Sequence, residues 1–301
     1  MTTLTGMTGT NPRDFLAALG LLRILASSQD DARLSFKNNG RFAPEVFGTD
    51  AQCLAELVAR DAASHAGSQP WRLEYSKSEK RGTKSVADLK PPPSVFRNFM
   101  RCAIESWSEG RREQAAYAAA FATDVAVDGK GNTKPTAFHF TAANQQFLDT
   151  VERIRGSIDQ AWCELALFAG HEERSGPNLR WDPAADRAYA LMATDPNDRG
   201  TAVSAPLEWL AFRALPLLPV VPRGTRAETT CVRGHRNEMR FHWPLWSTPA
   251  SLHTVTSLLR VNWWQDRRDL ATIGVIAICA SEIRRTAQGG FGNFGPAQVT
   301  V

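Results

Sequence analysis

The stretch Asn11-Pro12-Arg13-Asp14-Phe15-Leu16-Ala17-Ala18-Leu19-Gly20-Leu21-Leu22 decides the fold of this chain. It predicts a helix over Pro12–Ala26, because proline suits the first helical position and Asn11 is a suitable N-cap. A helix that is apolar on nearly every face must be buried. We therefore expect the fold to be organised around this helix, with Gly20 in close packing against another element.

The rest of the chain predicts a helix-rich α+β fold with small mixed or antiparallel sheets. Residues 145–169 place apolar side chains at three- and four-residue spacing and predict one amphipathic helix. Residues 239–243 alternate as a half-buried strand does, whereas 272–281 fit either a buried strand or a buried helix. Further helices are expected over 51–62, 96–122 (one or two), 206–214 and 250–261, further strands at 33–37, 71–75, 179–182 and 187–192, an exposed loop at 124–135 and a flexible tail at 288–295.

The 301 residues are enough for one large domain or two smaller ones. Three consecutive prolines, Pro91 to Pro93, make a firm break in secondary structure. Seven of the nine tryptophans lie beyond residue 160. We therefore distinguish an N-terminal α+β region, 1–135, with a basic loop at 76–93, from a helical or α+β region, 136–301; one continuous domain is the alternative.

The net charge of +4 is mild, but the basic residues are concentrated in three segments that look irregular. Such segments are candidate phosphate contacts, and a solvated loop is the alternative for each. In the third segment, arginines precede an aromatic residue among glycines, a combination that suits a single strand of nucleic acid. The candidate nucleic-acid-binding residues are Lys77, Lys80, Arg81 and Lys84; Arg223, Arg226, Arg233 and Arg236; and Arg284, Arg285 and Phe291.

Several other classes of protein are disfavoured by the sequence. Residues 1–10 carry no Lys or Arg, which a secretory signal requires, and no uncharged apolar segment is long enough to span a bilayer. The five cysteines are far apart and form no CxxC pair, so neither a disulfide framework nor a zinc site is expected. We expect a cytoplasmic protein without metal, cofactor or membrane contact.

A metal-dependent nuclease is the enzymatic alternative. His235, Glu238 and His242 are candidate ligands, but their spacing on a strand would place the two histidines on opposite faces. An acidic quartet follows Trp181, although its Asp-Pro pairs are typical of turns. No catalytic motif of the common hydrolase or nucleotide-binding types occurs, so we expect no enzymatic activity. The quartet consists of Asp182, Asp186, Asp195 and Asp198.

Five stretches together resemble one family, and their order and spacing extend over most of the chain. They resemble the roughly 300-residue CRISPR-associated proteins of type I-U (now I-G) systems, the Csb group assigned as equivalent to the large subunit of Cascade-type effector complexes. None of the stretches is a catalytic signature. They are NPRDFLAALGLLRIL (11–25), KPTAFHFTAANQQFL (134–148), WDPAADRAYALMAT (181–194), PLEWLAFRALPLLP (206–219) and RFHWPLWST (240–248).

The resemblance implies a non-catalytic subunit of an RNA-guided surveillance complex in antiviral defence. Its implied partners are guide RNA, target DNA, other effector subunits and a separate nuclease-helicase. Base pairing reads most of the target in such complexes, whereas protein contacts the backbone and a short duplex motif. A purely structural subunit, whose arginines meet acidic partner proteins, remains the non-enzymatic alternative.

Overall fold

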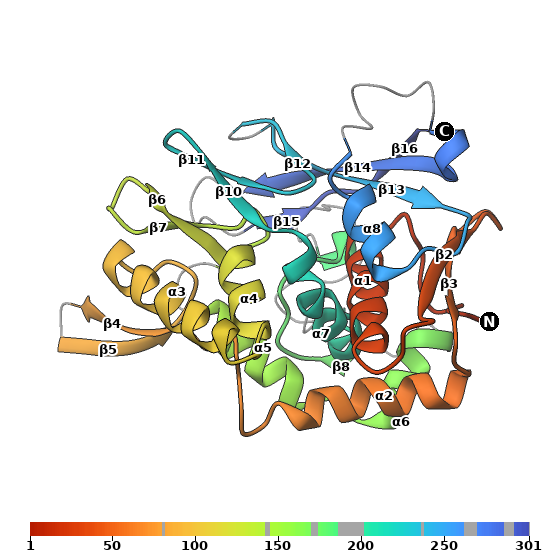
Figure 1. The fold of residues 1–301 in the computed structure, drawn as a ribbon, viewed down its shortest axis with the longest axis horizontal. Helices are drawn as coiled ribbons and strands as arrows, with labels where there is room; N and C mark the ends of the chain where they lie inside the picture. The colour runs from red at the N-terminus through yellow and green to blue at the C-terminus, as the bar shows by residue number, and fades with distance from the viewer. Residues whose placement is uncertain are drawn as a thin grey trace, which may run out of the picture.

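The computed structural model describes residues 1–79, 82–141, 145–169, 174–185, 202–235, 238–261, 270–285 and 292–300. In these ranges the chain forms eight α-helices and several small antiparallel sheets, so the predicted α+β class is confirmed. Figure 1 shows the larger sheet and the β6–β7 and β10–β11 hairpins on one side of the molecule and most helices on the other. No described helix is both long and apolar enough to cross a bilayer.

Helix α1 (Pro12–Ala26) lies in the middle of the molecule and packs along α7 (Ala205–Arg213) (Figure 1). The side chain of Asn11 accepts a hydrogen bond from the Arg13 amide at 2.9 Å, which confirms the predicted N-cap. Gly20 lies against the backbone of Leu210, so the two helices approach closely. The prediction of a buried N-terminal helix is confirmed, because nearly all its side chains are buried.

The helices beside this central pair come from the whole chain. Helix α2 packs against α6, and α3 packs against α4. A single continuous cluster of buried side chains draws on residues of both 1–135 and 136–301. The remaining helices are α2 (Ala51–Ser64), α3 (Pro93–Ser108), α4 (Glu113–Phe121), α5 (Phe147–Gly156), α6 (Gln160–Glu164) and α8 (Leu252–Leu258), with a π-helical turn at Leu165–Ala169 and 3-10 turns at Pro183–Ala185, Leu215–Leu217 and Ala271–Ile273.

The larger sheet has the strand order β12-β13-β14-β15, and β16 also pairs with β14. Its two long strands are antiparallel, with Trp243 opposite Cys279. Aromatic packing joins this sheet to the central helix, since the ring of Phe15 lies 5.8 Å from that of Trp243. The strands are β12 (Val232–Arg233), β13 (Arg240–Trp246), β14 (Val275–Arg285), β15 (Gly292–Phe294) and β16 (Gln298–Thr300).

A second sheet has the order β1-β3-β2, and four two-stranded units complete the fold. The β4–β5 hairpin extends away from the body, whereas β10–β11 lies beside β6–β7 (Figure 1). The bounds are β1 (Thr2–Thr3), β2 (Arg33–Lys37), β3 (Ala43–Phe47), β4 (Glu74–Glu79), β5 (Gly82–Ala87), β6 (Ala122–Val127), β7 (Thr133–Pro135), β8 (Arg174–Ser175), β9 (Ala202–Val203), β10 (Val220–Arg223) and β11 (Arg226–Thr229).

The prediction of one long helix over 145–169 was wrong. Helix α5 ends at Gly156, and α6 begins after Asp159, whose carboxylate accepts the Trp162 amide at 2.7 Å as an N-cap. Asp159 therefore starts a new helix within a continuous apolar pattern, because a capping side chain satisfies amides that a longer helix would pair internally. The expected C-cap at Gly170 lies outside the described residues.

Three segments predicted to be irregular form strands instead. The basic loop at 76–93 is largely the β4–β5 hairpin, and the loop at 124–135 contains the β6–β7 hairpin. Within the tail at 288–295, Gly292–Phe294 form strand β15 and Phe294 is fully buried, whereas 288–291 lie outside the described residues. Cross-strand hydrogen bonds and burial outweigh the polar and glycine-rich composition of these segments.

Two predicted strands, 179–182 and 187–192, and the segment 272–281, for which helix and strand were both open, have different outcomes. Residues 179–182 form no strand, but Leu179 and Trp181 are fully buried. The indole of Trp181 donates a hydrogen bond to the Phe138 carbonyl at 2.9 Å. The 272–281 segment, open between helix and strand, is mostly β14. The predicted strand at 187–192 lies outside the described residues.

Candidate nucleic-acid interface

The second predicted basic segment forms the β10–β11 hairpin. Gly224 has a φ of 58°, the left-handed conformation that a tight turn between two antiparallel strands requires. The hairpin therefore places Arg223 directly opposite Arg226. Two like charges in directly opposed positions repel each other, so this pair favours a counter-ion nearby.

That counter-ion in the protein is Glu228, which is on the same hairpin. Its Oε2 lies 3.5 Å from Nη1 of Arg223 and 4.0 Å from Nη1 of Arg233. Arg233 belongs to β12, so one carboxylate links the hairpin to the edge of the larger sheet. The hairpin and the sheet edge together bring three of the predicted arginines to one place.

The turn between β11 and β12 is fixed by a residue in an unusual conformation. Cys231 has a φ of 66°, although it is not glycine. Its thiol is buried and donates a hydrogen bond to the Leu259 carbonyl at 3.3 Å, and the His242 amide donates to its carbonyl at 2.8 Å. Burial raises the pKa of the Cys231 thiol to about 12, so it stays protonated. The contacts of Cys231 thus orient the chain at this turn.

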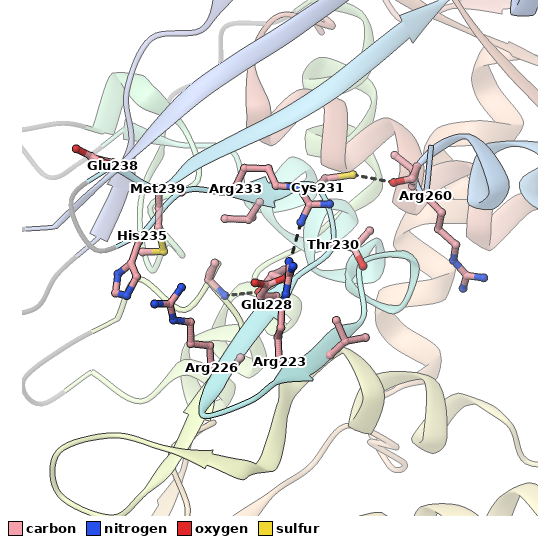
Figure 2. Close-up of a pocket in the computed structure, with 17 residues that line it drawn as sticks. Arg223, Arg226, Glu228, Thr230, Cys231, Arg233, His235, Glu238, Met239 and Arg260 are labelled. Carbon is pink, nitrogen blue, oxygen red and sulfur yellow. Dashed lines mark hydrogen bonds and ion pairs between the residues drawn. The ribbon is translucent and has the colours of Figure 1, made fainter. Parts of the chain in front are cut away.

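The hairpin, β12 and the end of α8 enclose an open hollow of about 820 Å³. Figure 2 shows Arg226 and His235 at one side, Arg223 and Arg233 in the middle, and Arg260 at the opposite side. Among the described residues, four arginines and two glutamates line it, so the described lining carries two more positive than negative side chains. Apolar surface in the hollow comes from Val221, which is exposed, and from Met239, which is partly exposed.

The two outer arginines differ from the central ones in their surroundings. Within the described part of the chain, neither Arg226 nor Arg260 has a carboxylate within ion-pair distance. Both residues are exposed. Arg260 directly follows the last turn of α8 and was not singled out from the sequence, because an isolated arginine after a helix carries no local signal. Only the fold places it beside the hairpin.

The first basic segment lies apart from this hollow. Lys77 and Lys84 are exposed and are cross-strand partners in the β4–β5 hairpin. Their ammonium groups therefore extend from one face of the hairpin. Lys80 and Arg81 lie outside the described residues.

The third basic segment is partly committed to contacts within the protein. Arg285 donates hydrogen bonds to the carbonyl groups of His139 at 3.2 Å and of Ala137 at 3.1 Å. Arg284 lies 3.6 Å from a carboxylate oxygen of Glu282. Phe291 lies outside the described residues, and so does Arg236 of the second segment. The structure therefore brings together Arg223, Arg226 and Arg233 and does not place Arg284 or Arg285 in the hollow.

The residues of the nuclease alternative do not form a metal site in the described ranges. His235 and Glu238 line the hollow, whereas His242 lies on β13 opposite Ala280. Among the described residues no group of three or more His, Cys, Asp or Glu side chains is placed to hold a metal ion. Asp182 accepts a hydrogen bond from Asn11 at 3.1 Å and pairs with Arg13. The other three residues of the acidic quartet lie outside the described ranges.

The buried side chain of His139, which no catalytic motif marks in the sequence, forms a pair with Asp88 that resembles a catalytic dyad. His139 Nε2 lies 2.7 Å from Asp88 and 3.3 Å from the Thr141 hydroxyl. Burial lowers the pKa of His139. In a catalytic triad the histidine contacts the nucleophile with one ring nitrogen and the carboxylate with the other. Here Asp88 and the Thr141 hydroxyl both contact Nε2 of His139. Because Asp88 also accepts the Phe147 amide at 3.2 Å, the group anchors the start of α5.

Comparison with known proteins assigns neither a family nor a function to these residues. No protein-family model matches the chain, and no curated protein matches it in sequence.

Proposed function

We propose that this chain is a non-catalytic, nucleic-acid-binding subunit of a cytoplasmic RNA-guided CRISPR surveillance complex. It contacts guide RNA or target DNA, or both, and leaves strand cleavage to a separate nuclease-helicase. The resemblance of its sequence to the type I-U (I-G) proteins supports the complex, and the arginine-lined hollow supports the ligand.

The single observation that carries the proposal is the excess of arginine in the hollow. Arg226 and Arg260 flank the Arg223–Glu228–Arg233 group, and no carboxylate in the described chain neutralises them. Guanidinium groups bind phosphate through parallel hydrogen bonds, and cations spread along a groove follow a nucleic-acid backbone. Apolar side chains between the cations give unstacked bases a surface to contact.

The proposed ligand explains why the basic residues lie on hairpins. A protein that reads backbone shape needs cations in several positions and needs no catalytic cleft. The exposed Lys77–Lys84 pair on β4–β5 supplies a second contact, directed away from the body (Figure 1). Both hairpins reduce their own charge repulsion when they bind phosphate.

The proposal is tested by reconstituting the effector complex with and without this chain. We expect the complete complex to contain guide RNA and to bind target DNA, and we expect the complex lacking the chain to bind target DNA more weakly. Charge reversal at Arg226 and Arg260 is expected to reproduce that loss without displacing the chain from the complex. Unchanged target binding by both altered complexes would contradict the proposal.

A second experiment addresses the enzymatic alternative. The purified chain is incubated with single- and double-stranded DNA and RNA in the presence of magnesium or manganese. We expect no cleavage. Cleavage that is lost in His235→Ala or Glu238→Ala would instead support the metal-dependent nuclease.

A further inference from the structure

Glu228 lies in the middle of the arginine-lined hollow and is shared by two arginines (Figure 2). Its Oε2 is 3.5 Å from Nη1 of Arg223 and 4.0 Å from Nη1 of Arg233. A charge-assisted hydrogen bond between guanidinium and carboxylate measures about 2.7–2.9 Å. Both distances are longer, so Glu228 balances the two cations electrostatically and does not form a close hydrogen bond in either of these contacts.

The space between the two arginines suits a larger anion than a carboxylate. A backbone phosphate has the same formal charge, and guanidinium binds its two free oxygens as it binds a carboxylate. We propose that Glu228 stands in for a backbone phosphate in the free protein, and that a phosphate of a bound single strand displaces its carboxylate from Arg223 and Arg233. This inference rests on the proposed function, since it names the group that the hollow receives.

The exchange requires little movement of the protein. Glu228 is held in β11, where it pairs with Val221 of β10, so the backbone of the hairpin is fixed. Only the side chain has to rotate for the carboxylate to leave the arginines. Glu228 is partly exposed, and the side chain of Arg223 is 78% exposed. Water therefore reaches the pair and solvates the carboxylate after its displacement.

The dimensions of the hollow favour a single strand over a duplex. A volume of about 820 Å³ lies within the range of pockets that hold small ligands and is too small for a base-paired helix. Val221 and Met239 provide apolar surface beside the cations. An unpaired nucleotide combines these two requirements, because its phosphate is charged and its base presents a flat face.

The internal anion gives the site a threshold for binding. A ligand with a single weak negative charge must compete with Glu228 and gains little. A strand that also contacts Arg226 and Arg260 gains these contacts in addition and displaces the carboxylate. Specificity is a difference between affinities, and a built-in competitor lowers the affinity for weak ligands most.

The test compares Glu228→Gln with Glu238→Gln in the full-length chain. Both variants remove one negative charge from the lining of the hollow. Glu238 makes no ion pair in the described chain, and its carboxylate points away from the arginines in Figure 2. Binding is measured by fluorescence anisotropy with labelled oligothymidylate and oligouridylate, and with the oligothymidylate annealed to its complement, at several salt concentrations.

We expect Glu228→Gln to raise the affinity for both single strands about threefold to fivefold, the effect of losing one partly exposed ion pair. The slope of log K against log salt should stay the same as in wild type, because the bound strand makes the same number of phosphate contacts in both proteins. Glu238→Gln should change the affinity by less than twofold. The annealed duplex should gain less than the single strands.

Three results would overturn the inference. If Glu228→Gln weakens binding, Glu228 positions the arginines and is not displaced. If both glutamine variants raise affinity equally, only the total charge of the hollow matters. If the duplex gains as much as the single strands, the hollow does not select an unpaired strand. Binding by the wild-type chain in any of these cases would leave the proposed function intact, whereas absence of binding by every variant, alone and in the assembled complex, would contradict both.

Discussion

Gly20 of α1 lies so close to Leu210 of α7 that a Cβ atom added at Gly20 would be 1.8 Å from the Leu210 carbonyl oxygen. The neighbouring atom belongs to the backbone of a buried helix, so it cannot move aside as a flexible side chain does. The contact determines how closely the two central helices of the fold approach each other. The absence of a side chain at one position therefore supports the packing of the whole core.

Gly20→Ala is expected to lower the free energy of unfolding by about 3 kcal/mol, because α1 must shift away from α7. Urea denaturation of the full chain measures this change. The matched control is Gly156→Ala, at the last residue of α5, where an added Cβ meets nothing within 4 Å. That variant should be as stable as wild type or slightly more stable. Equal stabilities of Gly20→Ala and wild type would contradict the close packing of Gly20 against Leu210.

The buried carboxyl group of Glu208 is expected to make the protein less stable as the pH rises towards neutrality. It is 2% exposed and accepts the Leu179 amide at 3.1 Å. Burial, opposed in part by Arg13, raises the pKa of Glu208 from 4.5 to about 7. The folded protein therefore binds a proton that the unfolded chain releases between about pH 4.5 and pH 7, and the contribution of Glu208 to stability falls as the pH rises through this range.

Glu208→Gln keeps an oxygen that accepts the Leu179 amide but cannot ionise. We expect it to match wild type near about pH 5 and to exceed it above about pH 7 by up to about 3 kcal/mol. Thermal or urea unfolding at several pH values measures the difference. Burial lowers the pKa of His139, which makes stability rise with pH in part of the same range. The contribution of His139 cancels when the free energy of unfolding of wild type is subtracted from that of Glu208→Gln. A difference in free energy that does not vary with pH would contradict the prediction.

Arg213 balances two acidic side chains within an aromatic cluster. Its guanidinium pairs with Asp61 at 3.1 Å and with Glu113, and its side chain is 7% exposed. Arg213→Met is expected to cost about 3–5 kcal/mol, because it leaves Asp61 without its arginine partner in a site with little water. Arg60→Ala, which breaks a surface pair with Glu56 on α2, should cost less than about 1 kcal/mol. Similar losses in the two variants would show that the buried pair is no more important than the surface one.

The outer arginines of the hollow predict the salt dependence of binding. Arg226→Ala and Arg260→Ala should each weaken binding to single-stranded nucleic acid and lower the slope of log K against log salt by about 0.7. Arg60→Ala removes the same charge from α2, on the opposite side of the molecule from the β10–β11 hairpin (Figure 1). It should leave the slope unchanged. A uniform effect of all three variants would assign binding to net charge and not to the hollow.

Predictions from local sequence patterns succeeded where one residue type has a direct structural consequence. Asn11 and Pro12 define the start of α1, and the continuous apolar residues that follow have no position except the interior. Predictions failed where a capping residue or a pairing partner overrode the pattern. Asp159 divides an apolar periodicity that fits one helix, and the polar residues of β4–β5 pair across a turn.

The candidate interface was predictable only in part. The density of basic residues between Arg223 and Arg233 identified the segment, because charge is visible in the sequence. Neither the shared carboxylate of Glu228 nor the position of Arg260 was predictable. Arg260 follows α8, and its approach to the hairpin depends on how α8 packs in the folded chain.

The sequence by itself determined that an apolar helix beginning at Pro12 is buried and that the chain has an α+β composition of elements, because capping and hydrophobic periodicity act over a few residues. Only the tertiary structure decided which cations share a surface. Arg223, Arg233 and Arg260 come from a hairpin, a sheet edge and a helix end, and electrostatic interaction depends on distance in space. The same sequence pattern assigns Arg285 to a basic segment, yet the fold directs its guanidinium to the carbonyl groups of Ala137 and His139.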